Sequence, residues 1–324
     1  MSHAGLDRLR DAAAIVYRSM SPTPAYPWPL LREATGVECW VKHENHTPIG
    51  AFKLRGGLVY LERLRAREPE LGGLISATRG NHGQSLAFAC ARQQITCVIV
   101  VPHGNAREKN AAMRALGAEL IEYGRDFDEA RSHACQLAAA RGLHFVPSFH
   151  PDLVEGVASY ALELFEAAPA LDAVYVPIGL GSGICGVVRA RDALGLSTRV
   201  VGVVAQGANA YALSFHAGKV LTTPEASTMA DGMAVRVPDA AALDIIRQGV
   251  AAIVEVDDAA IEHAIRMLLR TTHNLSEGAG AAPLAALLEE RETMQGKRVG
   301  LILCGANIDS EVLARVLGKG DEAA

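Results

Sequence analysis

The sequence has few of the residues on which disulfide-held proteins and zinc proteins depend. Aromatic residues make up 5% of its 324 positions, and its six cysteines lie far apart, with no C-x-x-C pair among them. A chain of this length can build a core without disulfides, and the missing pair spacing excludes the usual structural zinc sites. We therefore expect neither a disulfide framework nor a zinc centre.

Long apolar runs and clusters of one charge are also absent. No apolar stretch approaches the roughly 20 residues of a membrane span, and the N-terminal stretch "MSHAGLDRLRDAAAIVYRSM" carries charges where a secretory signal would be apolar. The 31 Lys and Arg residues are scattered among 36 Asp and Glu residues, which leaves no basic surface for nucleic acid or a membrane. These absences predict a cytoplasmic protein with no nucleic-acid partner and no membrane partner.

What the sequence does have is a regular alternation of apolar strand-like runs and helical stretches. The runs are nearly continuous in Val, Ile and Leu, which is typical of parallel strands buried on both faces. The predicted strands are 73–77, 96–101, 118–123, 172–178, 199–205 and 298–305, and helices among and after them are 84–93, 106–116, 128–141, 184–194 and 310–317. The pattern predicts an α/β fold with doubly wound, mostly parallel sheets.

No Ser-, Gly- or Pro-rich linker divides the chain, so a second domain could arise only where the chain folds back on itself. Residues 71–146 contain a compact set of strand–helix units. We predict that they form a small α/β domain inserted into a large, discontinuous domain of residues 1–70 and 147–324.

One lysine stands at the junction of a turn and a helix in "NHTPIGAFKLRGG" (45–57). Lys53 follows the aromatic Phe52, and helical apolar spacing begins at Leu54. A solvated lysine at a helix start is the common case. A lysine becomes a useful base or nucleophile only when its pKa falls or when it is condensed with a carbonyl group.

A glycine-rich loop, "GLGSGICG" (179–186), follows a predicted strand and opens a helix. Its glycine spacing fits the dinucleotide fingerprint, but that fingerprint needs an acidic residue at the end of the next strand, where Ala205 and Gln206 stand. An NAD-dependent oxidoreductase is therefore disfavoured. Small residues before a helix N-terminus also fit a phosphate with no nucleotide attached, and a tight turn that binds nothing is the remaining alternative.

One cofactor, pyridoxal 5'-phosphate (PLP), requires both a lysine and a phosphate site. Six segments, in order, resemble the fold-type II PLP enzymes, specifically the serine/threonine dehydratase and serine racemase family with its two-domain, tryptophan synthase β-like fold. They are "KHENHTPIGAFKLRGG" (42–57), "SATRGNHGQ" (76–84), "PIGLGSGICG" (177–186), "TMADGMAV" (228–235), "SEGAGAAPLAAL" (276–287) and "LCGANID" (303–309). The resemblance runs from about residue 20 to residue 317.

The resemblance implies roles for residues in four of these segments. Lys53 would carry PLP as a Schiff base in the large domain, with Phe52 beside the ring, Asn81 at its 3'-hydroxyl and Cys304 beside its pyridine nitrogen. The implied phosphate loop is Gly179, Leu180, Gly181, Ser182 and Gly183, in which Leu180 and Ser182 replace two usual glycines. The implied substrate loop is Thr78, Arg79, Gly80, Asn81 and His82.

The resemblance also implies a reaction and an assembly. The expected reaction is a β-elimination that converts L-threonine, L-serine or a related β-hydroxy amino acid to a 2-oxo acid and ammonia, in a homodimeric ammonia-lyase. The alternatives are an amino-acid racemase, a β-replacement synthase, or a PLP-binding protein without turnover. Arg79 stands where the racemases carry a proton-donating serine, and a guanidinium cannot play that part. We therefore expect little racemase activity.

Two further positions depart from the family pattern. The divalent-cation site of the family would use acidic residues where this sequence has Val204 and Ala210, and hard cations need oxygen ligands. We therefore predict no metal there. The segment 148–163 also differs from the family pattern, which leaves the side chain of the substrate open.

Overall fold

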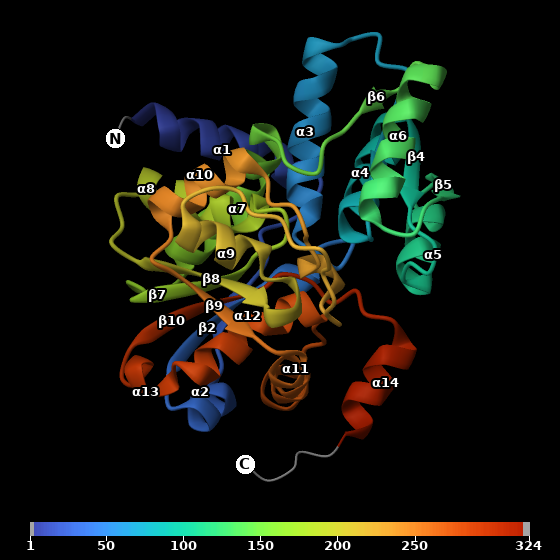
Figure 1. Cartoon of the computed structure of the whole chain (residues 1–324). Helices are drawn as coiled ribbons and strands as arrows, with labels where there is room; N and C mark the ends of the chain where they lie inside the picture. Colours follow the sequence, from blue (N-terminus) through green and yellow to red (C-terminus); the bar gives the residue numbers. More distant parts are fainter. Residues whose placement is uncertain (1–2, 320–324) are drawn as a thin grey trace.

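The structure, a computed structural model, describes residues 3–319 and contains two open sheets flanked by helices (Figure 1). The strands over these residues are β1 (Ala25–Pro27), β2 (Glu38–His43), β3 (Gly73–Ala77), β4 (Thr96–Val101), β5 (Glu119–Glu122), β6 (His144–Phe145), β7 (Ala173–Pro177), β8 (Arg199–Ala205), β9 (Ala252–Val256) and β10 (Arg298–Leu303).

The helices cover both sheets and join them. They are α1 (His3–Tyr17), α2 (Pro29–Thr35), α3 (Lys53–Arg67), α4 (Asn81–Gln93), α5 (Arg107–Ala115), α6 (Phe127–Arg141), α7 (Pro151–Ala167), α8 (Ser182–Ala193), α9 (Ala210–Ala217), α10 (Ala240–Gly249), α11 (Asp258–Thr272), α12 (Gly278–Glu289), α13 (Arg291–Met294) and α14 (Ser310–Gly318). Short 3-10 turns are η1 (Glu44–His46), η2 (Gln206–Ala208) and η3 (Asp231–Met233). None of the described helices is long and apolar enough to cross a bilayer.

The larger sheet has the strand order β1-β2-β10-β7-β8-β9. Its neighbours run parallel except for the short edge strand β1, which pairs antiparallel with β2. From β7 the chain proceeds outward through β8 to β9, and β10 then returns to the other side of β7. Because the direction of winding reverses between β7 and β10, a crevice opens at the carboxyl ends of these two strands.

The smaller sheet is wholly parallel, with the order β5-β4-β3-β6. Side chains of one strand point alternately to its two faces. On one face Leu74 and Ile99 pack with α4, and on the other Ile75 and Val98 pack with α6. Both sheets confirm the predicted α/β fold with doubly wound, mostly parallel strands.

Helix α3 stands between the two sheets (Figure 1). On one side it packs against α4 of the smaller sheet, and on the other against α7 of the larger sheet. A side chain at the start of α3 therefore lies at the junction of both halves of the molecule.

The sequence pattern missed several strands and the starts of two helices. Strand β2 has the sequence "ECWVKH" and pairs along its whole length with β10, but its charged residues broke the apolar run that indicates a buried strand. Helices α4 and α8 begin at Asn81 and Ser182, two or three residues before the predicted starts at 84 and 184. Glycine and polar residues in those first turns look like loop in a sequence, because they favour turns.

A buried ionic cluster fixes the start of α3. Arg55 is 0% exposed, and its guanidinium donates to both carboxylate oxygens of Glu44, at 2.7 and 3.0 Å, and to both of Glu163, at 2.6 and 2.8 Å. Lys42 completes the cluster with a 2.5 Å hydrogen bond to Glu163. Two cations face two carboxylates, so the cluster is neutral only while every member is present.

We expect removal of Arg55 to destabilise the fold strongly. Arg55→Met leaves Glu44 and Glu163 buried with one cation, so the free energy of unfolding should fall by about 3–5 kcal/mol. Urea unfolding followed by circular dichroism measures it. The exposed Arg10 on α1 supplies the control, since Arg10→Met should change stability by less than about 0.5 kcal/mol. A loss below about 1 kcal/mol for Arg55→Met would show that the cluster does not stabilise α3.

Candidate active site

The predicted site residues meet in one cavity of about 600 Å³. The predicted residues reach it from four places in the chain, which are the start of α3, the loop after β3, the loop after β7 and the end of β10. The last three are carboxyl ends of parallel strands, where open α/β sheets place their ligand sites. A volume of this size suits a small organic ligand.

The backbone places Lys53 beside Cys304. The N–H of Phe52 donates to the carbonyl oxygen of Cys304 at 2.9 Å, and Ala51 forms an isolated bridge with Gly305. The Lys53 side chain therefore lines the cavity at the start of α3, next to the end of β10. It donates to the hydroxyl oxygen of Ser182 at 2.9 Å and lies 4.9 Å from the centre of the Phe52 ring.

The surroundings of Lys53 disfavour its charged form. Burial lowers the pKa of Lys53 to about 8, and the neighbouring Cys304 and Glu277 offset the shift only in part. An exposed lysine has a pKa of about 10.4. A larger fraction of the Lys53 amine is therefore neutral near pH 7, which is the form that can accept a proton or attack a carbonyl.

The glycine loop after β7 presents an open helix N-terminus to this amine. Gly181 has a left-handed φ of +97°, which favours glycine, and precedes α8 without giving it a side-chain cap. Two tyrosine hydroxyls hold the loop in place, since Tyr211 donates to the carbonyl of Leu180 and Tyr160 to that of Gly183, each at 3.1 Å. The first N–H groups of α8, at Ser182 and Gly183, point along the positive end of the helix dipole and suit an anion.

A second open helix N-terminus follows β3. The loop of Thr78, Arg79 and Gly80 leads directly into α4, which also lacks a side-chain cap. The hydroxyl oxygen of Thr78 accepts from the N–H of Gly80 at 2.9 Å, which fixes the loop. The cavity therefore has two uncapped helix N-termini that suit an anion, one on a helix of each sheet.

Asn81 belongs to a buried polar network. Its side-chain amide donates to Glu277 at 2.7 Å, and its oxygen accepts from Asn307 at 2.9 Å. Lys109 lies 3.2 Å from Glu277 and 2.7 Å from Asp231. Burial opposes the charge on Lys109, but Glu277 and Asp231 outweigh it and raise the pKa of Lys109. The network joins α4 and α5 of the smaller sheet to segments of the larger one.

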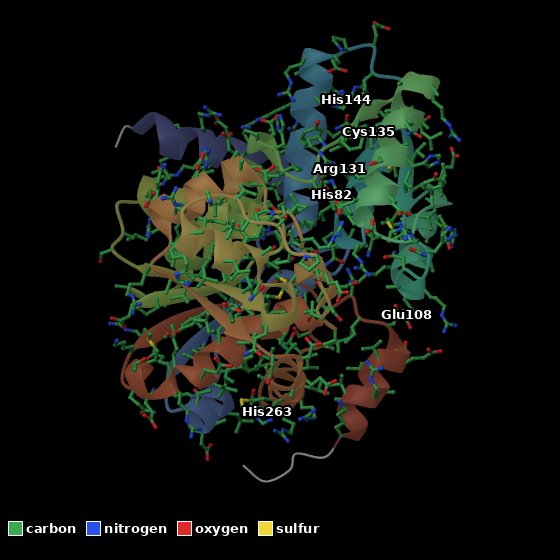
Figure 2. All side chains as sticks on the ribbon, in the orientation of Figure 1. His82, Glu108, Arg131, Cys135, His144 and His263 are labelled. Atoms are coloured by element: carbon green, nitrogen blue, oxygen red, sulfur yellow. The ribbon has the colours of Figure 1, made fainter. Side chains whose placement is uncertain are left out.

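His82 and Cys304 are both held in neutral forms. Burial and the charge of Lys53 lower the pKa of His82 to about 3, and the Nε2 atom of His82 has no hydrogen-bond partner. Burial is also the main cause that raises the pKa of Cys304 well above its usual value. Figure 2 labels His82 between α3 and α6, together with Arg131, which also lines the cavity.

Comparison with known proteins identifies the family. Residues 16–305 match the family described as "Pyridoxal-phosphate dependent enzyme". The chain belongs to this family. L-threonine ammonia-lyase of Geobacter sulfurreducens is 37% identical over 90% of this chain and 73% of its own length. L-threo-3-hydroxyaspartate ammonia-lyase of Saccharomyces cerevisiae is 30% identical over 96% of both chains. The processed form of threonine deaminase isoform 2 from Solanum lycopersicum is a structural neighbour with a TM-score of 0.90 and 30% identity, covering 98% of this chain and 93% of its own.

These similarities confirm the fold-type II resemblance, its serine/threonine dehydratase family and the cofactor. The match disfavours the dinucleotide interpretation of the glycine loop, because the family depends on PLP. The cavity of this PLP-dependent enzyme fits that cofactor on its own geometry. It contains the Lys53 amine, whose pKa is lowered, and the aromatic ring of Phe52 beside that amine. It also contains the uncapped N-terminus of α8, whose first residue, Ser182, accepts a hydrogen bond from the amine.

Every predicted site residue lines this cavity. Sequence reasoning did not assign roles to Lys109, Asp231, Glu277 or Asn307, although three of them lie in segments that carried the resemblance. Lys109 had no signal, since it resembles any other charged residue of an amphipathic helix. Val204 and Ala210, which stand where the family pattern has the ligands of its divalent cation, are 1% and 0% exposed. No group of three or more His, Cys, Asp or Glu among the described residues could hold a metal ion.

The lowered pKa of Lys53 predicts its reactivity in the cofactor-free protein. Since the amine loses its proton near pH 8, trace acetylation of Lys53 should reach half its maximal rate at about pH 8, more than two units below an exposed lysine. Mass spectrometry of the Lys53 peptide measures the rate. The exposed Lys219, read in the same samples, is the internal control. Equal midpoints for the two lysines would contradict the proposed effect of burial.

Proposed function

We propose that this PLP-dependent enzyme is an ammonia-lyase for L-threonine, L-serine or a related β-hydroxy amino acid. The observation that carries the proposal is the Lys53 amine, with its lowered pKa, in one cavity with two open helix N-termini. Two relatives that align over 90% and 96% of this chain are named as ammonia-lyases, which supports the same reaction. A base and two anion sites are the elements that this chemistry needs from a protein.

The cofactor would be held by residues from both sheets. The phosphate suits the N-terminus of α8, where Gly179, Leu180, Gly181, Ser182 and Gly183 form the loop. Phe52 and Asn81 would flank the ring, and Cys304 would lie near its nitrogen. A thiol with a raised pKa is a neutral partner, so it does not hold that nitrogen protonated as a carboxylate would.

Lys53 is the proposed catalytic base. When bound, PLP would supply a ring that can accept the electrons released at Cα. The Lys53 amine then accepts the Cα proton, and Ser182 keeps that amine oriented through its hydrogen bond. His82 cannot supply a proton at neutral pH, because its pKa is about 3.

The open end of α4 is the proposed site for the substrate α-carboxylate. The N–H groups of Asn81 and His82 lie in its first turn, without a side-chain cap, and the helix dipole favours an anion there. Thr78 and Gly80 shape this loop through their mutual hydrogen bond. With the carboxylate held, the β-hydroxyl would leave with one proton as water, which balances the proton that Lys53 takes from Cα. The released enamine then hydrolyses to a 2-oxo acid and ammonia.

Arg79 argues against the racemase alternative. A racemase needs a second group that returns a proton to the opposite face of Cα, and the family's racemases use a serine at this position, as the resemblance implies. The guanidinium of Arg79 stays protonated in all ordinary conditions and does not exchange protons usefully. Elimination therefore remains the favoured outcome.

The remaining proposals concern organisation. We propose that residues 71–146 act as a small domain and that residues 1–70 and 147–324 form the large one, because the smaller sheet lies wholly within 73–145. A homodimer is supported by the half-exposed Tyr26 and Leu30, at 51% and 50%, on and beside the edge strand β1. A cytoplasmic location is supported by six cysteines that are all unpaired, as in reducing compartments.

Replacement of Lys53 tests the proposed function. Wild-type protein should be yellow, form a 2-oxo acid from L-threonine or L-serine, and yield a phosphopyridoxyl group on the Lys53 peptide after borohydride reduction. Lys53→Ala should lower the rate of 2-oxo acid formation by at least about 1,000-fold, since it removes both the base and the covalent attachment. Lys219→Ala, which changes an exposed lysine, should leave the rate unaltered. Borohydride labelling at another residue, or cofactor without any turnover, would refute the proposal.

We also expect the reaction to need no divalent cation at the family position. Val204 and Ala210 offer no oxygen ligand from their side chains. Dialysis against EDTA should therefore leave kcat and the melting temperature within error of the untreated enzyme. Loss of activity that Mg²⁺ or Ca²⁺ restores would show that a cation binds through other groups.

A further inference from the structure

Arg79 differs from the other cations of the cavity because it is partly buried and yet forms no ion pair with any residue that the structure describes. Among the described residues that line the cavity, Lys109 pairs with Asp231 and Glu277, while Arg236 pairs with Asp128 and Asp126. Lys53 donates to Ser182, and Arg131 is exposed to solvent. The half-buried Arg79 has no ion pair, and its buried Nε has no hydrogen-bond partner.

An unpaired guanidinium in such a place is costly. Its charge cannot be removed by deprotonation, and a buried N–H without an acceptor loses its hydration with no compensation. Buried donors in folded proteins are nearly always paired, so an exception inside a ligand cavity indicates a group that the ligand supplies. An anion is the natural partner, and a carboxylate fits the guanidinium fork with two parallel hydrogen bonds.

The backbone holds Arg79 at this place. On one side the N–H of Thr78 donates to the carbonyl of Val100 at 3.1 Å, and its hydroxyl accepts from Gly80. On the other side Gly80 packs so tightly on Lys109 that an added Cβ would lie 2.4 Å from its Cδ atom. Lys109 is itself held by two carboxylates. The loop therefore cannot carry Arg79 out of the cavity without breaking this packing.

The cofactor phosphate and the substrate α-carboxylate, the two anions that the proposed reaction requires, each fit a helix N-terminus better than they fit Arg79. The cofactor phosphate suits the N-terminus of α8, which follows β7 of the larger sheet. The α-carboxylate suits the N-terminus of α4, which begins directly after the loop that carries Arg79. Arg79 lines the same cavity directly before the proposed α-carboxylate site, and neither of these two anions requires it.

We propose that Arg79 binds a second carboxylate of the substrate, so that the preferred substrate is an acidic β-hydroxy amino acid of the 3-hydroxyaspartate type. This rests on the proposed elimination reaction and specifies its substrate. Only a dicarboxylic substrate can form a bidentate ion pair with Arg79, because a monocarboxylic substrate leaves the guanidinium unpaired. This difference would make the enzyme prefer the dicarboxylic substrate.

The first experiment compares two substrates with the holoenzyme. We expect wild-type kcat/KM for L-threo-3-hydroxyaspartate to exceed that for L-threonine, and Arg79→Ser to lower the ratio of the two values by about 100-fold. Arg79→Lys should give an intermediate ratio, since it keeps the charge but not the fork. Arg10→Ser, at an exposed arginine on α1, should leave the ratio unchanged.

The second experiment measures binding without turnover. Succinate and butanoate have the same chain length but two and one carboxylates, and neither carries an amino group that could react. Titrations followed by the cofactor absorbance should give a Kd for succinate that rises about 100-fold in Arg79→Ser. Butanoate should show no comparable change. The unfolding temperature of each variant checks that it is folded.

Three results would overturn the inference. An equal loss for both substrates would assign Arg79 to the α-carboxylate, and a loss of PLP affinity would assign it to the phosphate. Unchanged succinate binding would leave it no role in recognition. Failure of the proposed function would look different: wild-type protein would produce no 2-oxo acid from any β-hydroxy amino acid, while the succinate titration would still report on Arg79.

Discussion

The buried cluster of Arg55, Glu44, Glu163 and Lys42 is the constraint on which the site depends. It connects β2, η1, α3 and α7 by charged hydrogen bonds without solvent. Arg55 lies two residues beyond Lys53, so the guanidinium that holds the cluster together also sets the start of α3. Removing any member leaves an unpaired charge in the core. The position of Lys53, the proposed catalytic base, is therefore tied to the stability of the fold.

The same segment is held from the opposite side by the end of β10. The hydrogen bond from Phe52 to Cys304 and the bridge from Ala51 to Gly305 place the lysine against a neutral thiol. Burial in this position lowers the pKa of the amine, and Ser182 orients it. Position, protonation state and orientation of one side chain thus come from three different parts of the chain.

The two proposed anion sites belong to helices that pack on different sheets. Each sheet contributes a helix N-terminus to the cavity, and helix α3 stands between the two sheets (Figure 1). The network of Lys109, Asp231 and Glu277 crosses between the halves and keeps these ends at a fixed separation. Arg79 adds a cation that this network does not neutralise, and that difference is the basis of the inferred preference for an acidic substrate.

The sequence by itself determined the alternation of buried strands and helices, and hence the class of fold, because apolar periodicity is a local property of the chain. It also determined the family, since six ordered segments carry the lysine, both loops and the thiol. It did not indicate β2, whose burial depends on β10, 260 residues later, or the first turns of α4 and α8. Only the tertiary structure decided which charges are paired. Lys109 and Arg79 look alike in sequence, but two carboxylates from distant segments reach Lys109, whereas no carboxylate of residues 3–319 pairs with Arg79. Pairing depends on distances between residues far apart in the chain, and those distances exist only once the chain has folded.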